Sequence, residues 1–337
     1  MKAFEWVSPT SVNDAVKLLR AGATTRDPDE APRPIAGGQD LLTTMKDYIT
    51  RPARVVNLKA IRGMDKIEGD ARRGLKIGAL VTLTQLAEHP TVRRDFPALA
   101  EAAHSVATPQ IRNLGTVGGN LCQRPRCWYY RLEEAVCLKK GGSECFAATG
   151  ENKYNAILGG GPSYIVHPSD LAPALVALGA SVVVAGAQGA RTIPLEKFFT
   201  LPSEGSVRRE NVLANEDIIT EITVPASAFA ARSTYLKFKE RDSLDFALAA
   251  VAAAVELGAD KTVKQARVVL GGVAPVPWRV PEAEAALAGK RLDQAALDEA
   301  ARLALAGAKP LAKNAYKIPL TQALVRRALG KVGGLNS

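Results

Sequence analysis

The chain has 337 residues, 47% of them hydrophobic and 23% charged, and a formal net charge of +10. This length exceeds one typical domain, so we expect two or three units that each bury a core. The composition is typical of a soluble globular protein, and the lack of a long apolar run excludes a membrane-spanning helix. The start, MKAFEWVSPT, has no apolar stretch of the signal-peptide kind, so we expect a cytoplasmic location.

The excess positive charge gathers near the C-terminus. Residues 301–337 contain seven basic residues and no acidic one, and Tyr316 is the only aromatic residue among them. Nucleic-acid-binding segments usually combine basic with aromatic residues or form a recognisable module, so we expect no nucleic acid here. We interpret the segment as a solvated helical face or a docking surface for an acidic partner. The seven residues are Arg302, Lys309, Lys313, Lys317, Arg326, Arg327 and Lys331.

The first third of the chain predicts short alternating elements. The spacing of apolar residues favours a helix within 8–22, which Thr10 or Ser11 would cap. Residues 34–49 predict a strand, a glycine turn and a helix in succession. We then expect short strands at 53–58 and 74–80, and two helices within 82–106 that are separated at Pro90.

Farther along, the pattern becomes irregular and then changes class. A long irregular segment extends to about residue 164, and it precedes a helix at 169–180 and a hairpin at 181–195. Strands followed by helices are typical of an α+β domain, so we expect a separate C-terminal domain from about residue 228. Its expected elements are long strands at 233–257 and 265–280 and helices within 282–327.

Two glycine loops are candidate phosphate-binding sites. AGGQDL, residues 36–41, follows a predicted strand and opens a predicted helix, and GTVGGN, residues 115–120, has similar chemistry. Backbone N–H groups and the helix dipole can hold phosphate oxygens at such places, and glycine lets the backbone approach the ligand. Each loop alone could also be an ordinary turn. Neither loop matches the Rossmann or P-loop pattern, so a dinucleotide would be held in another way.

All four cysteines lie within 24 residues, at positions 122, 127, 137 and 145. A cytoplasmic chain of this size needs no disulfide. Structural zinc sites usually arrive as close pairs of cysteines, and only Cys122 and Cys127 are that close. An irregular loop that also contains Lys139 and Lys140 suits thiolates around an iron–sulfur cluster. Cluster, zinc and incidental thiols all remain open from spacing alone.

Four motifs in order resemble the FAD-binding medium subunit of the xanthine dehydrogenase family of molybdenum hydroxylases. They are IAGGQDLL, QIRNLGTVGGNLCQRPRCWYY, HPSDLAPAL and YLKFKERDSLDFALAAVAA. The resemblance covers essentially the whole chain and implies an α+β protein. It would have a two-subdomain, PCMH-type FAD-binding α/β region at 1–227, divided near residue 58, with a cysteine-bearing insertion at about 121–164. A C-terminal domain of the carbon monoxide dehydrogenase flavoprotein type would follow at 228–337.

The same resemblance implies an FAD site between the two subdomains. One side of the pyrophosphate would meet residues 36–41, and the other would meet the second glycine loop. Ser169 and Asp170 would hold ribityl or ribose hydroxyls, and Lys237 would lie near the isoalloxazine ring. From the residues alone, we would favour a helix cap for Asp170 and a solvated strand residue for Lys237. The implied cofactor-binding residues are Ala36, Gly37, Gly38, Gln39, Asp40, Leu41, Thr116, Gly118, Gly119, Asn120, Ser169, Asp170 and Lys237.

The insertion further resembles the subgroup whose flavoprotein carries an extra [4Fe–4S] cluster, of the aldehyde oxidoreductase or 4-hydroxybenzoyl-CoA reductase type. Cys127, Cys137 and Cys145 match the ligand positions of that subgroup. The fourth ligand would be Cys122, the remaining thiol, or Ser163, which stands where relatives often have a cysteine. An incomplete cluster, or none, is the further alternative.

Function follows from the resemblance as an expectation. The chain would be an oxidoreductase subunit without catalytic residues of its own, because its three histidines form no catalytic arrangement. It would take electrons from a large molybdopterin subunit through a small [2Fe–2S] subunit and pass them to NAD⁺, oxygen, a quinone or another acceptor. A partner with an export signal would make the location periplasmic. The alternatives are a non-catalytic thiol–metal module that binds nucleic acid or an acidic partner, and a flavin oxidase acting alone.

Overall fold

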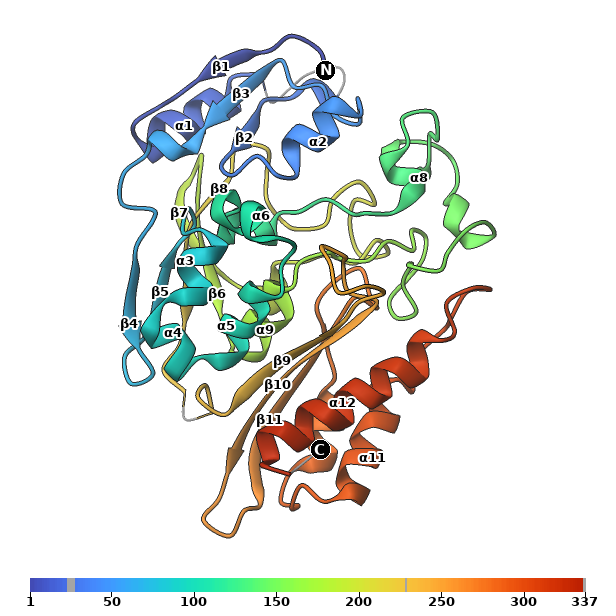
Figure 1. Cartoon of the computed structure of the whole chain (residues 1–337). Coiled ribbons are helices and arrows are strands. Elements are labelled where there is room, and N and C mark those ends of the chain that lie inside the picture. Colours follow the sequence, from blue (N-terminus) through green and yellow to red (C-terminus); the bar gives the residue numbers. More distant parts are fainter. Residues whose placement is uncertain (23–27, 228, 336–337) are drawn as a thin grey trace.

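The computed structural model describes residues 1–22, 28–227 and 229–335 (Figure 1). A parallel three-stranded sheet of order β1-β3-β2 begins the chain. The first helix starts where predicted, because the Ser11 hydroxyl accepts a hydrogen bond from the Asp14 N–H at 3.1 Å. The elements are β1 (Glu5–Val7), α1 (Val12–Arg20), β2 (Arg33–Ile35), α2 (Leu41–Lys46) and β3 (Arg54–Asn57).

An antiparallel five-stranded sheet follows, and short helices cover it. Its order is β4-β5-β8-β6-β7, and β6 and β7 form the predicted hairpin. The sequence predicts two helices within 82–106, whereas the structure has three. Pro97 begins a further helix, as Pro90 does, because proline starts helices more readily than it continues them. The strands are β4 (Ile67–Asp70), β5 (Gly74–Gly78), β6 (Ser181–Gly186), β7 (Gly189–Pro194) and β8 (Ile218–Val224). The helices are α3 (Leu83–Glu88), α4 (Pro90–Asp95), α5 (Pro97–His104), α6 (Pro109–Leu114), α7 (Val117–Leu121), α8 (Trp128–Arg131) and α9 (Leu171–Ala177).

The last sheet is antiparallel, of order β12-β11-β10-β9, and the C-terminal helices lie against it (Figure 1). The single strand predicted over 233–257 is wrong, because residues 239–248 leave the sheet and join two antiparallel strands. In this connection Arg241 and Asp245 form an ion pair at 2.9 Å. The elements are β9 (Ser233–Phe238), β10 (Ala249–Leu257), β11 (Val263–Gly271), β12 (Trp278–Arg279), α10 (Pro281–Leu287), α11 (Gln294–Ala304) and α12 (Lys317–Gly333). The α+β class is confirmed.

Strand β10 contributes to two hydrophobic cores. Residues 249–255, AAVAAAV, are all buried. Side chains alternate between the two faces of the strand. Ala250 and Ala252 therefore lie in the core of the five-stranded sheet and its helices, whereas Val251 and Val255 lie in the core beneath α10, α11 and α12. Small side chains on both faces let the backbone of this strand approach helices on either side.

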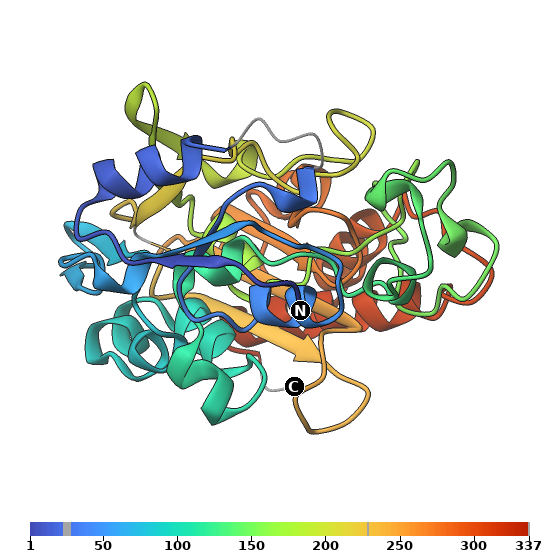
Figure 2. The ribbon, with the colours of Figure 1, turned by 90° about the horizontal axis from the view of Figure 1, so that it is seen from above.

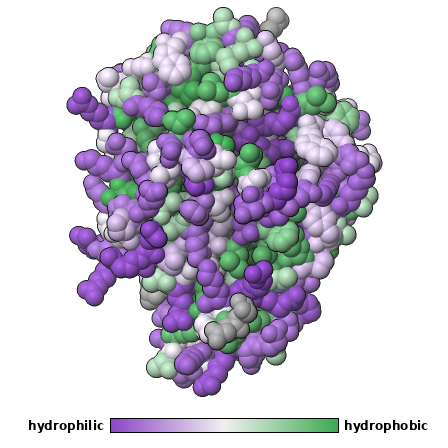
Figure 3. Space-filling view, viewed as in Figure 1, coloured by the Kyte–Doolittle hydropathy of each residue, from purple (hydrophilic) through white to green (hydrophobic). Residues whose placement is uncertain are grey.

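The basic C-terminal segment is largely neutralised by acidic residues. Lys331 pairs with Glu101 at 2.7 Å, Arg302 with Glu299 at 2.7 Å, and Lys313 with Glu151. On the face seen in Figure 3, hydrophilic side chains predominate and apolar ones form small separate areas. Within the part of the chain that the structure describes, no helix is long and apolar enough to cross a membrane.

Lys317 is a buried exception in this segment. Its side chain is fully buried at the start of α12, and Nζ donates to the carbonyl oxygens of Tyr154, at 3.1 Å, and Gly272, at 2.7 Å. Burial lowers the pKa of Lys317 to about 7. Figures 1 and 2 place the chain before α12 beside the end of the insertion, where the Tyr316 hydroxyl donates to the Lys153 carbonyl at 3.0 Å.

We expect Lys317→Met to change how stability depends on pH. Below pH 7 the lysine is protonated in both states, whereas between pH 7 and 10 the unfolded chain binds a proton that the folded chain has released. Wild-type stability therefore gains about 1.4 kcal/mol per pH unit from this residue across that window, and the variant lacks the gain. Urea unfolding of both proteins from pH 6 to 9 measures the difference. Lys309→Met, at an exposed position, is the control, and parallel profiles for wild type and Lys317→Met would contradict the expectation.

Candidate functional site

The two glycine loops touch each other. Residues 36–41 connect β2 to α2, and Gly115 and Thr116 connect α6 to α7. A Cβ atom on Gly37 would lie 2.1 Å from the carbonyl oxygen of Leu114, so glycine is required for this approach. Gly38 has φ +72°, a conformation that favours glycine. The fold thus places two stretches of glycine backbone side by side.

A cavity of about 480 Å³ lies between these loops. Gly119 is one wall: a Cβ atom there would meet only the Thr116 hydroxyl, at 3.0 Å, and so would take up cavity space. The cavity gathers all the predicted FAD-site residues except Gly118 and Ser169. Those lining it are Ala36, Gly37, Gly38, Gln39, Asp40, Leu41, Thr116, Gly119, Asn120, Asp170 and Lys237.

A second cavity, of about 420 Å³, adjoins the first. Ala36, Thr116 and Gly119 line both, so the glycine loops form their common wall. Gly118 lines the second cavity only, and its N–H donates to the Ala79 carbonyl at 2.9 Å. Basic residues outnumber acidic ones around this cavity, and this excess would suit an anionic ligand, although Glu210 pairs with Arg124 and Lys139, and Asp29 with Arg208. The basic residues are Arg33, Arg124, Lys139, Lys140, Arg208 and Arg209, and the acidic ones are Asp29, Glu210 and Asp217.

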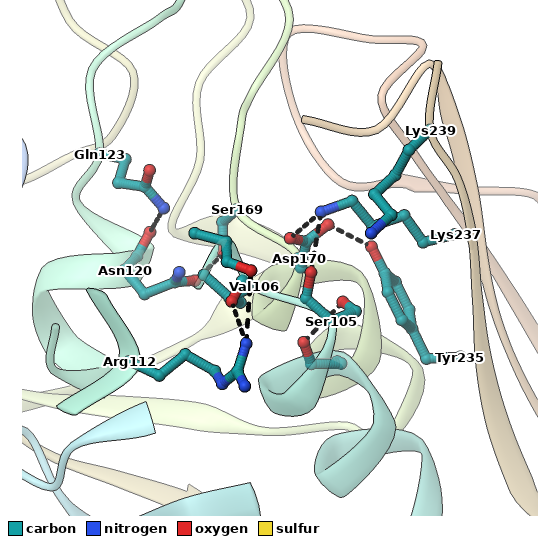
Figure 4. Close-up of polar contacts among 12 residues, drawn as sticks. Ser105, Val106, Arg112, Asn120, Gln123, Ser169, Asp170, Tyr235, Lys237 and Lys239 are labelled. Atoms are coloured by element: carbon teal, nitrogen blue, oxygen red, sulfur yellow. Dashed lines mark hydrogen bonds and ion pairs between the residues drawn. The ribbon is translucent and has the colours of Figure 1, made fainter. Parts of the chain in front are cut away.

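A buried ion pair, drawn in Figure 4, lines the first cavity. Lys237 Nζ, from β9, lies 2.8 Å from Asp170 Oδ2, and both side chains are about 5% exposed or less. The Tyr235 hydroxyl donates to Asp170 Oδ1 at 2.6 Å. Burial and the Asp170 carboxylate raise the pKa of Tyr235 well above its usual value, so the phenol stays protonated as a donor. Both oxygens of Asp170 are therefore engaged by the protein.

Ser169 and Asn120 form a second polar contact at this site (Figure 4). The Ser169 hydroxyl donates to Asn120 Oδ1 and accepts from the Ala172 N–H at 3.0 Å. Ser169, and not Asp170, therefore makes the side-chain capping bond of α9. The hydrogen bond between Ser169 and Asn120 joins the HPSD segment to α7. It thereby fixes the position of Asp170, the next residue in the chain.

Asp40 binds the cysteine-bearing insertion. Its Oδ1 lies 2.7 Å from Arg131 Nη2 and 2.9 Å from Arg126 Nη2, and its Oδ2 accepts from the Arg124 N–H at 2.7 Å. Three residues near the start of the insertion are thus bonded to the first glycine loop.

Three of the four cysteines share a small cavity inside the insertion. Cys127, Cys137 and Cys145 line it together with Ser163 and the buried Lys139. Burial raises the pKa of Cys127, and the Asn155 amide donates to its sulfur at 3.7 Å. Among the described residues, no three His, Cys, Asp or Glu side chains are arranged to hold a single metal ion.

Cys122 lies elsewhere. It follows α7 and lines the two cavities at the glycine loops, and it does not line the cavity of the other thiols. Burial, with the nearby Glu210 carboxylate, raises the pKa of Cys122 to about 12, which favours the protonated thiol over the thiolate that metals bind. Ser163, the other candidate for a fourth ligand, lines the cavity of the three thiols.

Several residues of the site were missed at the level of sequence. Tyr235 is two residues before Lys237 on β9, and this spacing places both on one face of a strand. Glu210 is buried and pairs with Lys139 at 2.6 Å and Arg124 at 2.8 Å, but no local motif marks it. The arginine-rich letters RPRCWYYR were a signal for the Asp40 contact.

Comparisons with known proteins show the family of this chain. Residues 2–227 match the family described as "FAD binding domain in molybdopterin dehydrogenase", and residues 233–332 match "CO dehydrogenase flavoprotein C-terminal domain". The chain is 36% identical over 300 residues to the aldehyde oxidoreductase FAD-binding subunit PaoB of Escherichia coli (strain K12), covering 88% of this chain and 90% of that protein.

Two further comparisons involve carbon monoxide dehydrogenase of Hydrogenophaga pseudoflava. Its medium chain is 30% identical over 331 residues, covering 97% of this chain and 96% of the relative. A solved structure of that enzyme, lacking the Mo-pyranopterin moiety of the molybdenum cofactor, matches with a TM-score of 0.76 at 28% identity, covering 98% and 97% of the two chains. The chain therefore belongs to the FAD-binding medium subunits of the molybdenum hydroxylases, and it is the flavoprotein component of an oxidoreductase.

Proposed function

We propose that this chain binds FAD in the two adjoining cavities and transfers electrons from molybdenum and iron–sulfur centres of partner subunits to an external acceptor. The observation that carries the proposal is the contact between the two glycine loops, which form the common wall of both cavities. Bare backbone at this wall suits a pyrophosphate, with one half of the dinucleotide in each cavity.

The protein's own residues would bind and orient the flavin. Residues 36–41 and 116–120 would surround the pyrophosphate, and Asn120 and Ser169 are already fixed by their mutual hydrogen bond. Lys237 would present its ammonium to the ligand with its charge balanced by Asp170. When bound, FAD supplies electron transfer in single or paired steps, which no side chain here can supply.

We further propose a [4Fe–4S] cluster in the insertion. Cys127, Cys137 and Cys145 supply thiols around one cavity, and the Ser163 hydroxyl is the fourth side chain there that could bind iron. The buried Lys139 would moderate the negative charge of such a cluster. Cys122 is the less suitable fourth ligand, because it lies at the glycine loops.

The assembly and its setting complete the proposal. The partners would be a small [2Fe–2S] subunit and a large molybdopterin subunit, and the acceptor NAD⁺, oxygen, a quinone or another carrier. The FAD-binding domain would cover 1–227 and the C-terminal domain 228–337, although the boundary residue 228 lies outside the described residues. The complex would act in the cytoplasm, or in the periplasm if a partner carries an export signal. The comparisons give no support to the alternative of a thiol–metal module binding nucleic acid.

Flavin analysis tests the first proposal. The full chain, purified with its cofactors retained, is expected to release close to one FAD per chain on denaturation, seen by absorption and fluorescence. Copurification with two further subunits would extend the result to the assembly. A chain that neither retains flavin nor takes up added FAD would refute the proposal.

Iron analysis tests the cluster. We expect Cys127→Ala to lose most of the iron bound per chain and Ser163→Ala to lower it, while Cys122→Ala leaves it unchanged. Cys122→Ala is the matched control, since it removes a thiol outside the shared cavity. Equal iron content in wild type and Cys127→Ala would exclude this ligand set.

A further inference from the structure

Asp40 connects the predicted flavin loop directly to the insertion. Its carboxylate belongs to the loop that lines the 480 Å³ cavity, but its hydrogen-bond partners come from the beginning of the insertion. The contact with Arg131 is well protected from solvent, because the Arg131 side chain is 14% exposed and that of Asp40 is 16% exposed. Such shielding strengthens the ion pair relative to one at the surface.

Arg131 also fixes the backbone that precedes Cys127. Its Nε donates to the Pro125 carbonyl at 2.7 Å and its Nη2 to the Arg124 carbonyl at 3.1 Å. Arg131 is the last residue of α8, which begins immediately after Cys127. One planar guanidinium thus binds both Asp40 and the backbone just before Cys127, with Nη2 shared between Asp40 and the Arg124 carbonyl, which a lysine could do only in part.

We propose that the Arg131–Asp40 pair couples the flavin site to the cysteine cavity. Flavin that orders residues 36–41 fixes Asp40, which in turn holds Arg131 and the segment carrying Cys127. The coupling is reciprocal, so an ordered insertion raises the affinity for FAD. Arg131 is a positioning residue: it lines neither of the two cavities at the glycine loops. The inference rests on the proposed function, because it requires that FAD binds.

Two other groups of contacts hold the insertion without involving this loop. Glu210 ties Arg124 and Lys139 to residues 206–210. At the end of the insertion, Glu240 binds Lys153 Nζ and the Tyr154 hydroxyl, each at 2.6 Å. The contacts of Glu210 and Glu240 hold the insertion in place. Of the three groups of contacts, only that of Asp40 involves residues 36–41.

Thiol reactivity and FAD affinity test the coupling in the full chain. The chain, freed of flavin and metal and reduced, is treated with Ellman's reagent with and without FAD, and labelled peptides are identified by mass spectrometry. We expect FAD to slow labelling of Cys127, Cys137 and Cys145 in the wild type. In Arg131→Gln this protection is reduced but not abolished, because Arg126 and the Arg124 N–H still contact Asp40, and the Kd for FAD rises about tenfold, within the range of ordinary coupling energies. Arg131→Lys, which keeps the charge, restores part of both effects.

Glu240→Gln is the matched control, because it removes an acidic partner at the other end of the insertion. Its thiols are expected to react faster without FAD, while protection by FAD persists. Equal FAD affinity and equal protection in wild type and Arg131→Gln would overturn the coupling, as would a wild type that binds FAD without protecting its thiols. A wild type that fails to bind FAD would instead overturn the proposed function and the coupling with it.

Discussion

Replacing Asp170 by alanine is expected to destabilise the protein by about 3–5 kcal/mol, the usual cost of removing one partner of a buried ion pair. The ammonium of Lys237 would stay buried without its carboxylate, and the hydroxyl of Tyr235 would lose its acceptor. Urea unfolding followed by circular dichroism measures the change.

Two control variants distinguish the loss of the ion pair from nonspecific destabilisation by a substitution at this position. The double variant Asp170→Ala/Lys237→Met removes both charges and is expected to be more stable than Asp170→Ala alone, because neighbours in one network are not additive. Glu299→Ala, which breaks the exposed pair with Arg302, is expected to cost at most about 0.5 kcal/mol. A loss below about 1 kcal/mol for Asp170→Ala would contradict the expected cost of an uncompensated buried charge.

Gly37→Ala is expected to separate the two glycine loops. The new Cβ atom would lie 2.1 Å from the Leu114 carbonyl oxygen, and backbone on both sides must move to admit it. Overpacking of this kind costs about 1–3 kcal/mol, and the displaced wall should leave the chain with little retained FAD. Thermal unfolding and flavin content per chain measure the two effects.

Two other glycines are controls for this change. Gly205 has open space around its would-be Cβ atom, so Gly205→Ala is expected to leave stability and flavin content unchanged. At Gly119 the added methyl group would enter the cavity and lie 3.0 Å from the Thr116 hydroxyl, so Gly119→Ala is expected to weaken FAD binding with a smaller loss of stability than Gly37→Ala. If Gly37→Ala behaves as Gly205→Ala does, the contact between the loops is not required.

The glycine loops were predictable from sequence because their requirement is local. The motif AGGQDL by itself indicates glycine backbone between a strand and a helix, independently of the rest of the sequence. The partners of Asp170 were not predictable, because Tyr235 and Lys237 are 65 and 67 residues away in sequence. Strand β9 pairs with β10, and α9 packs against β10 and β11, so the assembly of sheet and helix brings these residues together and no local pattern encodes their meeting.

The strand and cysteine predictions failed or stayed open for a related reason. Apolar residues on either side of 239–248 suggested one strand, but ion pairs of the connection stabilise a reversal that periodicity does not register. Among the cysteines, Cys122 is a predicted fourth ligand only by elimination, with Ser163 as the alternative. In the fold Cys122 follows α7 at the glycine loops, whereas Ser163 lines the cavity of the other three thiols, and the fourth ligand stays a prediction.

The alternating burial of β10 makes the two halves of the protein interdependent. A chain cut near residue 228 would leave Ala250, Ala252 and Val269 facing water on one fragment and uncover the apolar surface beneath α5 and α9 on the other. Neither fragment would then keep a closed hydrophobic core. The C-terminal domain thus covers the hydrophobic core of the half that carries the glycine loops. It also places Lys237 at the cavity, and this placement depends on β10 being part of both cores.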